Sequence, residues 1–121
     1  MYTYSFEKLE VWQLSRKLVK EIYTLTSGFP DPEKFGLVNQ MRRAVISIAS
    51  NLAEGTSRVG SKDKANYSQI AYSSLMELLN QLILSEDLGF LENSQLENTR
   101  ILIDEIANKI TALRKAQLNK K

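Results

Sequence analysis

Apolar residues recur at alternating steps of three and four along almost the whole chain, and this spacing constrains the fold more than any other feature. Such spacing places side chains on one side of an α-helix. The pattern is interrupted at few points, because the two prolines stand together in GFPDPEKFG and most of the five glycines lie between periodic segments. Nothing in the sequence indicates strands. The chain is therefore predicted to be all-α.

The interruptions divide the chain into four predicted helices, at about 6–27, 32–55, 61–88 and 94–117. The residues expected to begin them are Ser5, Asp31, Ser61 and Ser94, the last forming a capping box with Glu97. Four helices of this length with short connections predict an antiparallel, up-down-up-down four-helix bundle. We expect a single domain spanning residues 1–121.

Neither histidine nor cysteine occurs among the 121 residues, which excludes several classes of site. Disulfides, the usual zinc sites and di-iron sites that need Glu-x-x-His pairs lose their ligands. Ser-His-Asp and Cys-His catalytic arrangements are excluded for the same reason. We therefore expect no metal, no cofactor, no catalytic residue and no enzymatic activity.

The sequence also lacks the features of a membrane or exported protein. No apolar run reaches the roughly 18–20 residues that span a bilayer. The first residues, MYTYSFEKLEVW, do not form a basic segment followed by an apolar one, as a signal peptide would. We expect a cytoplasmic protein without a membrane partner.

The second predicted helix has an unusually wide apolar surface. At about 100° per residue, its apolar side chains cover an arc of about 200°, whereas an ordinary core-facing stripe is about 100° wide. The outer flank of this arc contains the small residues Ala49 and Ala53, which allow another helix to approach closely. Two interpretations remain open: a central helix of a monomeric bundle, or a helix that also packs against another copy of the chain.

A polar sector runs along the same helix. Its members are Gln40, Arg43, Ser47, Asn51, Glu54 and Arg58. They could be solvated, with Glu54 and Arg58 paired at i,i+4. Alternatively, Asn51 and Glu54 could be buried hydrogen-bonding partners that fix the register of a neighbouring helix or loop. Glu54 is a poor catalyst because no second titrating group accompanies it. Gly55 permits the helix to end before a basic loop.

The net charge is only +2, but charged residues are unevenly distributed. Residues 34–65 contain six Lys and Arg against two acids, and residues 114–121 contain four Lys and Arg without an acid. Residues 66–113 contain seven acids and two basic residues. This asymmetry permits an anionic partner.

Basic residues around the second helix are the candidates for contacting nucleic-acid phosphates. They are Arg42, Arg43, Arg58, Lys62 and Lys64, with Arg16, Lys17 and Lys20 as further possibilities. The chain has no RNP aromatics, zinc knuckle or GXXG loop, so sequence-specific recognition is not expected.

Three segments carry a family resemblance: FEKLEVWQLSRKL at 6–18, FGLVNQMRRAVISIASNLAEG at 35–55 and YSQIAYSSLMELLNQLILSEDLGFL at 67–91. The ordered combination of L-x-V-W, F-G-L-x-x-Q-x-R-R-A and S-N-x-A-E-G resembles the four-helix bundle proteins of intervening sequences in bacterial 23S ribosomal RNA genes. The resemblance implies a ring-like homopentamer without known enzymatic activity. Asn51, Glu54 and Gly55 belong to its signature, with no established chemical role.

The chain is also similar to the accessory protein of diversity-generating retroelements, a basic pentameric bundle that binds nucleic acid and its reverse transcriptase. The present chain is less basic than that protein. Two functions follow as hypotheses. The first is a non-enzymatic homo-oligomer, with a pentamer favoured, that binds RNA or other nucleic acid. The alternative is a protein-interaction scaffold, or an accessory subunit for a nearby-encoded enzyme such as a reverse transcriptase, without direct nucleic-acid contact. The candidates for oligomer or helix packing are Ala49, Ala53, Asn51, Glu54 and Gly55.

Overall fold

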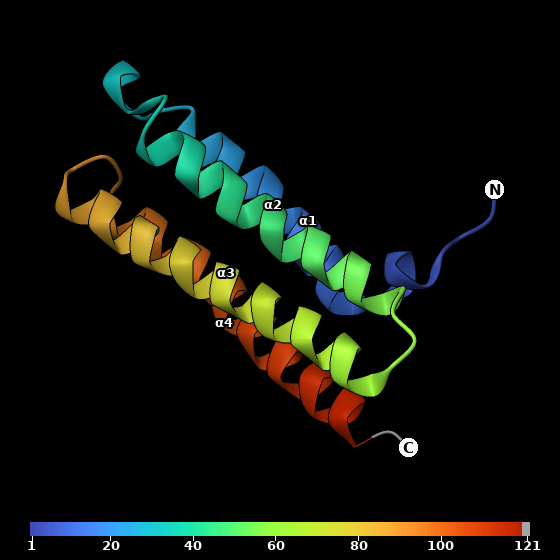
Figure 1. Cartoon of the computed structure of the whole chain (residues 1–121). Helices are drawn as coiled ribbons and strands as arrows, with labels where there is room; N and C mark the ends of the chain where they lie inside the picture. The colour runs from blue at the N-terminus through green and yellow to red at the C-terminus, as the bar shows by residue number, and fades with distance from the viewer. Residues whose placement is uncertain (120–121) are drawn as a thin grey trace.

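The computed structural model describes residues 1–119, and these form four long helices. They are α1 (Glu10–Thr26), α2 (Leu37–Thr56), α3 (Ser61–Asp87) and α4 (Asn93–Leu118), with short 3₁₀ helices at Ser5–Lys8 and Asp31–Glu33. Each helix packs against the next one along the chain, and α1 also packs against α4. The helices alternate in direction (Figure 1). The predicted all-α four-helix bundle is confirmed.

The bundle has two distinct ends (Figure 1). The α2–α3 end contains the N-terminus, the connection at 57–60 and the last turns of α4. The α3–α4 end contains the connections at 27–36 and 88–92. These two names are used below.

One apolar core joins all four helices. Its largest fully buried side chains include Leu18, Ile22, Met41, Ile48, Leu75, Leu82, Ile103 and Ile106. Burying each such side chain contributes about 1.5–3 kcal/mol relative to leaving it in water. The apolar residues that recur at steps of three and four in the sequence are therefore the ones that form the core.

The first helix begins later than predicted. Ser5–Lys8 forms a 3₁₀ turn, and the extended backbone of Leu9 (φ −76°, ψ 116°) separates this turn from α1. Ser5 is therefore not the N-cap of α1. At the start of the 3₁₀ turn, the main-chain N–H of Tyr4 donates to Oε2 of Glu7 at 2.8 Å.

The second helix also begins later, at Leu37 instead of about residue 32. The Asp-Pro-Glu signal begins only the short Asp31–Glu33 turn, because the backbone at Gly36 (φ −113°, ψ −108°) departs from helical geometry before α2 starts. In the third helix, Gly60 occupies the N-cap position, and the predicted cap, Ser61, is the first helical residue.

The capping box of α4 lies two residues earlier than predicted. The main-chain N–H of Glu92 donates to Oε1 of Gln95 at 2.8 Å, so these residues replace Ser94 and Glu97 as the box. The i,i+3 spacing was correctly identified, but two overlapping pairs in ENSQLE satisfy it.

Gly89 ends α3 in the left-handed region, with φ +80°. Its N–H donates to the carbonyl of Glu86, and the N–H of Phe90 donates to the carbonyl of Ser85, both at 2.9 Å. This pair of bonds is the Schellman motif, which satisfies helix carbonyls that would otherwise lack partners.

Candidate nucleic-acid interface

The five cations predicted to bind nucleic acid do not form one patch. Arg42 and Arg43 lie in the second turn of α2, whereas Arg58, Lys62 and Lys64 surround the connection at the α2–α3 end. Arg42 and Arg58 are sixteen positions apart, which corresponds to about 24 Å along a helix axis. The two groups therefore cannot contact the same phosphate.

Arg42 is engaged within the chain. Its Nε donates to Oγ1 of Thr26 at 3.0 Å, its terminal nitrogen donates to the carbonyl of Tyr23 at 3.3 Å, and its guanidinium lies 4.3 Å from the centre of the Tyr23 ring. A cation at this place complements the negative C-terminal end of α1. Arg42 therefore connects α2 to the end of α1.

Arg58 and Lys64 are also engaged. The guanidinium of Arg58 donates to the hydroxyl of Tyr67, lies 4.7 Å from that ring and pairs with Asp63 at 3.4 Å. The hydrogen bond to Tyr67, followed by the electrostatic contributions of Tyr67 and Asp63, raises the pKa of Arg58. Lys64 donates from Nζ to the carbonyl of Thr56, the last residue of α2, at 3.2 Å. These contacts hold the connection together.

Ten Lys and Arg side chains have no hydrogen bond or ion pair with any residue in the described range 1–119. They are Arg43, Lys62, Arg114 and Lys115, together with Lys8, Arg16, Lys17, Lys20, Lys34 and Arg100. Arg114 and Lys115 were not among the predicted candidates, although the excess of basic residues after residue 113 was visible in the sequence. Recognising them as neighbours of α3 requires knowing how α4 packs.

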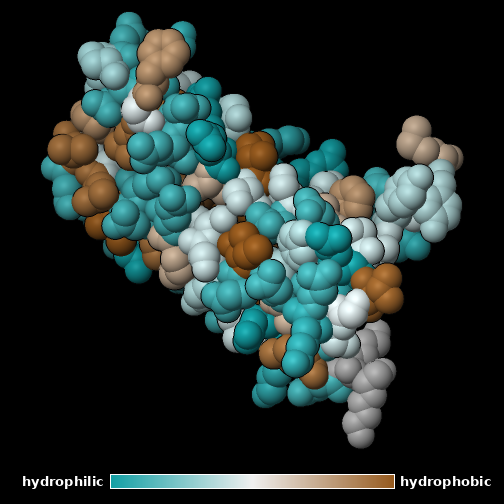
Figure 2. Space-filling view, in the orientation of Figure 1, coloured by the Kyte–Doolittle hydropathy of each residue, from teal (hydrophilic) through white to brown (hydrophobic). Residues whose placement is uncertain are grey.

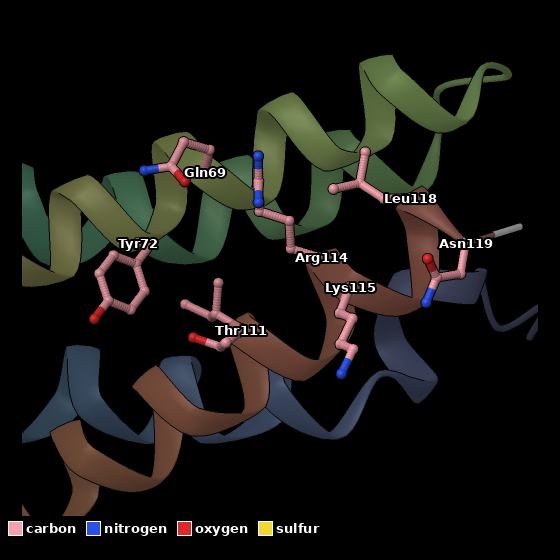
Figure 3. A pocket seen from close by; sticks show the side chains of 8 residues that line it. Gln69, Tyr72, Thr111, Arg114, Lys115, Leu118 and Asn119 are labelled. Atoms are coloured by element: carbon pink, nitrogen blue, oxygen red, sulfur yellow. The ribbon is translucent and has the colours of Figure 1, made fainter.

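Arg114 and Lys115 line a groove of about 340 Å³ between α3 and α4. The full lining is Gln69, Tyr72, Ile110, Thr111, Arg114, Lys115, Leu118 and Asn119. Figure 3 shows Gln69 and Tyr72 on α3, with Arg114 extending from α4 toward Gln69. Lys62 lies seven residues before Gln69 and hence on the same side of α3. The groove contains no acidic residue.

Charges are separated along the bundle. The α2–α3 end contains seven cations, Lys8, Arg58, Lys62, Lys64, Lys109, Arg114 and Lys115, against four acids, Glu7, Glu10, Glu54 and Asp63. The α3–α4 end contains six acids, Asp31, Glu33, Glu86, Asp87, Glu92 and Glu97, against three cations, Lys34, Arg42 and Arg43. An anionic ligand is therefore attracted to one end and repelled by the other.

The polar sector of α2 is divided between packing and solvent. Oγ of Ser47 hydrogen-bonds Oγ of Ser74 on α3 at 2.9 Å, and Nδ2 of Asn51 donates to the carbonyl and Oγ of Ser47 at 2.8 and 3.0 Å. Ser47 and Asn51 are half-buried, whereas Glu54 is exposed. Asn51 therefore supports the contact between α2 and α3, whereas Glu54 is exposed to solvent and takes no part in that contact.

The small residues of α2 lie on different sides of the helix. Gly55 is buried against α3, where a Cβ would stand 2.9 Å from Cβ of Tyr67. Ala49 and Ala53 are half-buried, and Ile46, at the far edge of the wide apolar arc, is 42% exposed. Part of that arc is thus uncovered in a single chain.

Residues 1–119 contain neither a membrane-spanning helix nor a cluster of metal-ligating side chains. No helix there has both the length and the apolar character needed to cross a membrane. Acidic side chains there do not come together in groups of three that could hold a metal ion.

The fold and its charged end define a small antiparallel four-helix bundle with a basic surface at one end. The chain belongs to the family of 23S rRNA-intervening sequence proteins, whose family model matches residues 7–112. A similar solved structure is the crystal structure of a protein of unknown function from the S23 ribosomal protein family of Bacteroides thetaiotaomicron. It is 23% identical, with a TM-score of 0.80 over 87% of this chain and 95% of that chain. No curated protein matches this sequence.

Proposed function

We propose that the protein is a non-enzymatic homo-oligomer that binds RNA or other nucleic acid through its α2–α3 end. The observation that carries this proposal is that Arg114 and Lys115 line one groove, unpaired with any residue in the range 1–119. Lys62, also unpaired in that range, lies on the same side of α3 as Gln69 of the groove. Unpaired cations can contact phosphates without first breaking an internal bond. Such contacts release counterions and give affinity that falls steeply with salt.

Exposed apolar residues support self-association. Ile83, Leu84 and Leu88, in and just after the last turns of α3, are 37%, 45% and 61% exposed. Figure 2 shows hydrophobic surface over this part of the bundle. Contiguous apolar surface of this kind marks interaction sites. We favour a pentamer because the sequence resembles proteins that form such rings, and each added copy repeats the basic end.

The test is a salt titration of RNA binding, read by fluorescence anisotropy. The triple variant K62A/R114A/K115A should bind more weakly, and its log–log salt slope should be shallower by about 2, since each single-strand phosphate contact contributes about 0.7. The variant K34A/R100A is the control, because it loses exposed cations that are not among the candidates for phosphate contact. Its slope should equal that of the wild type.

Two outcomes would contradict the proposal. Absence of RNA binding at low salt would remove the nucleic-acid function and favour a scaffold or accessory subunit that contacts only protein. A strict monomer in light scattering or native mass spectrometry would remove the oligomer.

A further inference from the structure

The groove between α3 and α4 has a mixed chemical character that phosphate binding alone does not explain. Its floor is apolar, since Ile110 is 1% exposed and Leu118 contributes more apolar surface. A site that contacts only a phosphate backbone needs cations but no apolar floor. Its volume of about 340 Å³ lies within the range of small-molecule sites, about 300–1,000 Å³.

Tyr72 supplies an aromatic surface in this groove. It is half-buried, and part of its side chain packs against the bundle core, which holds the ring in place. Figure 3 shows the ring between α3 and α4, beside Thr111. Nucleic-acid bases stack on such rings without regard to sequence, because every base has a π-face.

Polar groups surround the aromatic surface. Gln69, Thr111 and Asn119 supply hydrogen-bonding side chains, and Arg114 and Lys115 supply two positive charges on the adjacent turn of α4. An aromatic ring and two unpaired cations in the lining of one groove match the two parts of a nucleotide, a flat base and a phosphate. A paired base cannot reach the ring, because it is stacked inside the duplex.

We propose that this groove binds one unpaired nucleotide of a single-stranded nucleic acid, with the base on Tyr72 and the phosphate on Arg114 and Lys115. This inference rests on the proposed function and adds that single strands are the ligand. Binding at Tyr72 is independent of base sequence, in agreement with the absence of RNP, zinc-knuckle and GXXG motifs.

The test uses a short single-stranded RNA containing one 2-aminopurine, whose fluorescence is quenched on stacking. Wild type and Tyr72→Phe should bind and quench it. Tyr72→Leu keeps an apolar side chain and removes the ring, so it should lose the quenching and about tenfold in affinity. A duplex of the same sequence should bind without quenching and should be insensitive to Tyr72→Leu.

A second variant guards against a folding defect in Tyr72→Leu. Thr111 is exposed and lines the groove, so Thr111→Glu places a carboxylate there without disturbing the core. It should weaken single-strand binding more than Asn108→Glu, which adds the same charge on α4 outside the lining. Circular dichroism checks that each variant is folded.

The outcomes separate this inference from the proposed function. If folded Tyr72→Leu binds and quenches like the wild type, or if Thr111→Glu and Asn108→Glu behave alike, the groove does not hold a base, although RNA binding stands. If neither single-stranded nor duplex RNA binds at low salt, both proposals are wrong.

Discussion

Replacing Gly55 by alanine should destabilise the protein, although alanine is the better helix former. Gly55 lies inside α2, where alanine alone would contribute about 1 kcal/mol. The added Cβ, however, would stand 2.9 Å from Cβ of Tyr67 and 3.6 Å from the carbonyl oxygen of Lys64. Ordinary contacts begin at 3.4 Å, so the helices must separate by about 0.5 Å.

Neither neighbouring atom can rotate away, because one is a Cβ and the other belongs to the backbone of α3. Separation would also disturb the Ser47–Ser74 hydrogen bond along the same contact. Overpacking of this kind costs about 1–3 kcal/mol. We place Gly55 in the upper part of that range and expect a net loss of about 1–2 kcal/mol in the free energy of unfolding after the helix-propensity gain.

The assay is urea denaturation followed by circular dichroism, at one fixed protein concentration because oligomers are stabilised by mass action. Gly28→Ala is the matched control: its Cβ would meet only the carbonyl of Leu25 at an ordinary 3.7 Å. That variant should be unchanged or gain up to about 1 kcal/mol through the unfolded state. A stabilised Gly55→Ala would refute the close approach of α2 and α3.

Three further predictions concern the left-handed backbone at Gly89, the contacts of Arg42 and the Lys109–Glu10 ion pair. Gly89→Ala should cost about 1–2 kcal/mol in urea denaturation, because an alanine at φ +80° is strained. Arg42→Ala should lower the free energy of unfolding by about 1–3 kcal/mol, and Arg42→Lys should not restore it, since lysine cannot donate to two groups while stacking on a ring. The hydrogen bond from Lys109 to Glu10 raises the pKa of Lys109. The stability that this pair adds to the folded state is therefore complete below the ordinary lysine pKa of 10.5 and is lost as the pH rises through the higher folded-state pKa. Alkaline denaturation of Glu10→Gln should lack this component; an unchanged alkaline limb would contradict it.

The helices could be predicted because their apolar spacing reports burial directly. Their starts were less certain, since a capping signal specifies a helical turn but not whether the turn continues. Asp31 illustrates this: the signal is followed by a 3₁₀ turn, and Gly36 interrupts the chain before α2. In ENSQLE, two overlapping pairs fit a capping box, and the sequence alone does not choose between them.

The candidate site was predictable only in part, because the availability of a cation depends on the neighbours that the fold provides. Arg42 and Arg43 are adjacent and chemically identical in the sequence. In the structure, Arg42 is bound to the end of α1, whereas Arg43 is exposed. Conversely, Arg114 becomes a neighbour of Tyr72 only when α4 packs antiparallel to α3, and no local pattern states that pairing.

The separation of charge between the two ends has a thermodynamic consequence for assembly. Antiparallel helices largely cancel one another's dipoles, so side chains alone set the electrical polarity of the bundle. Copies that pack side by side in the same direction bring their basic ends together, and this repulsion opposes assembly at low ionic strength. A polyanion bound across those ends neutralises it. If the protein binds nucleic acid and self-associates as we propose, these two equilibria are reciprocally coupled, each strengthening the other by the same factor.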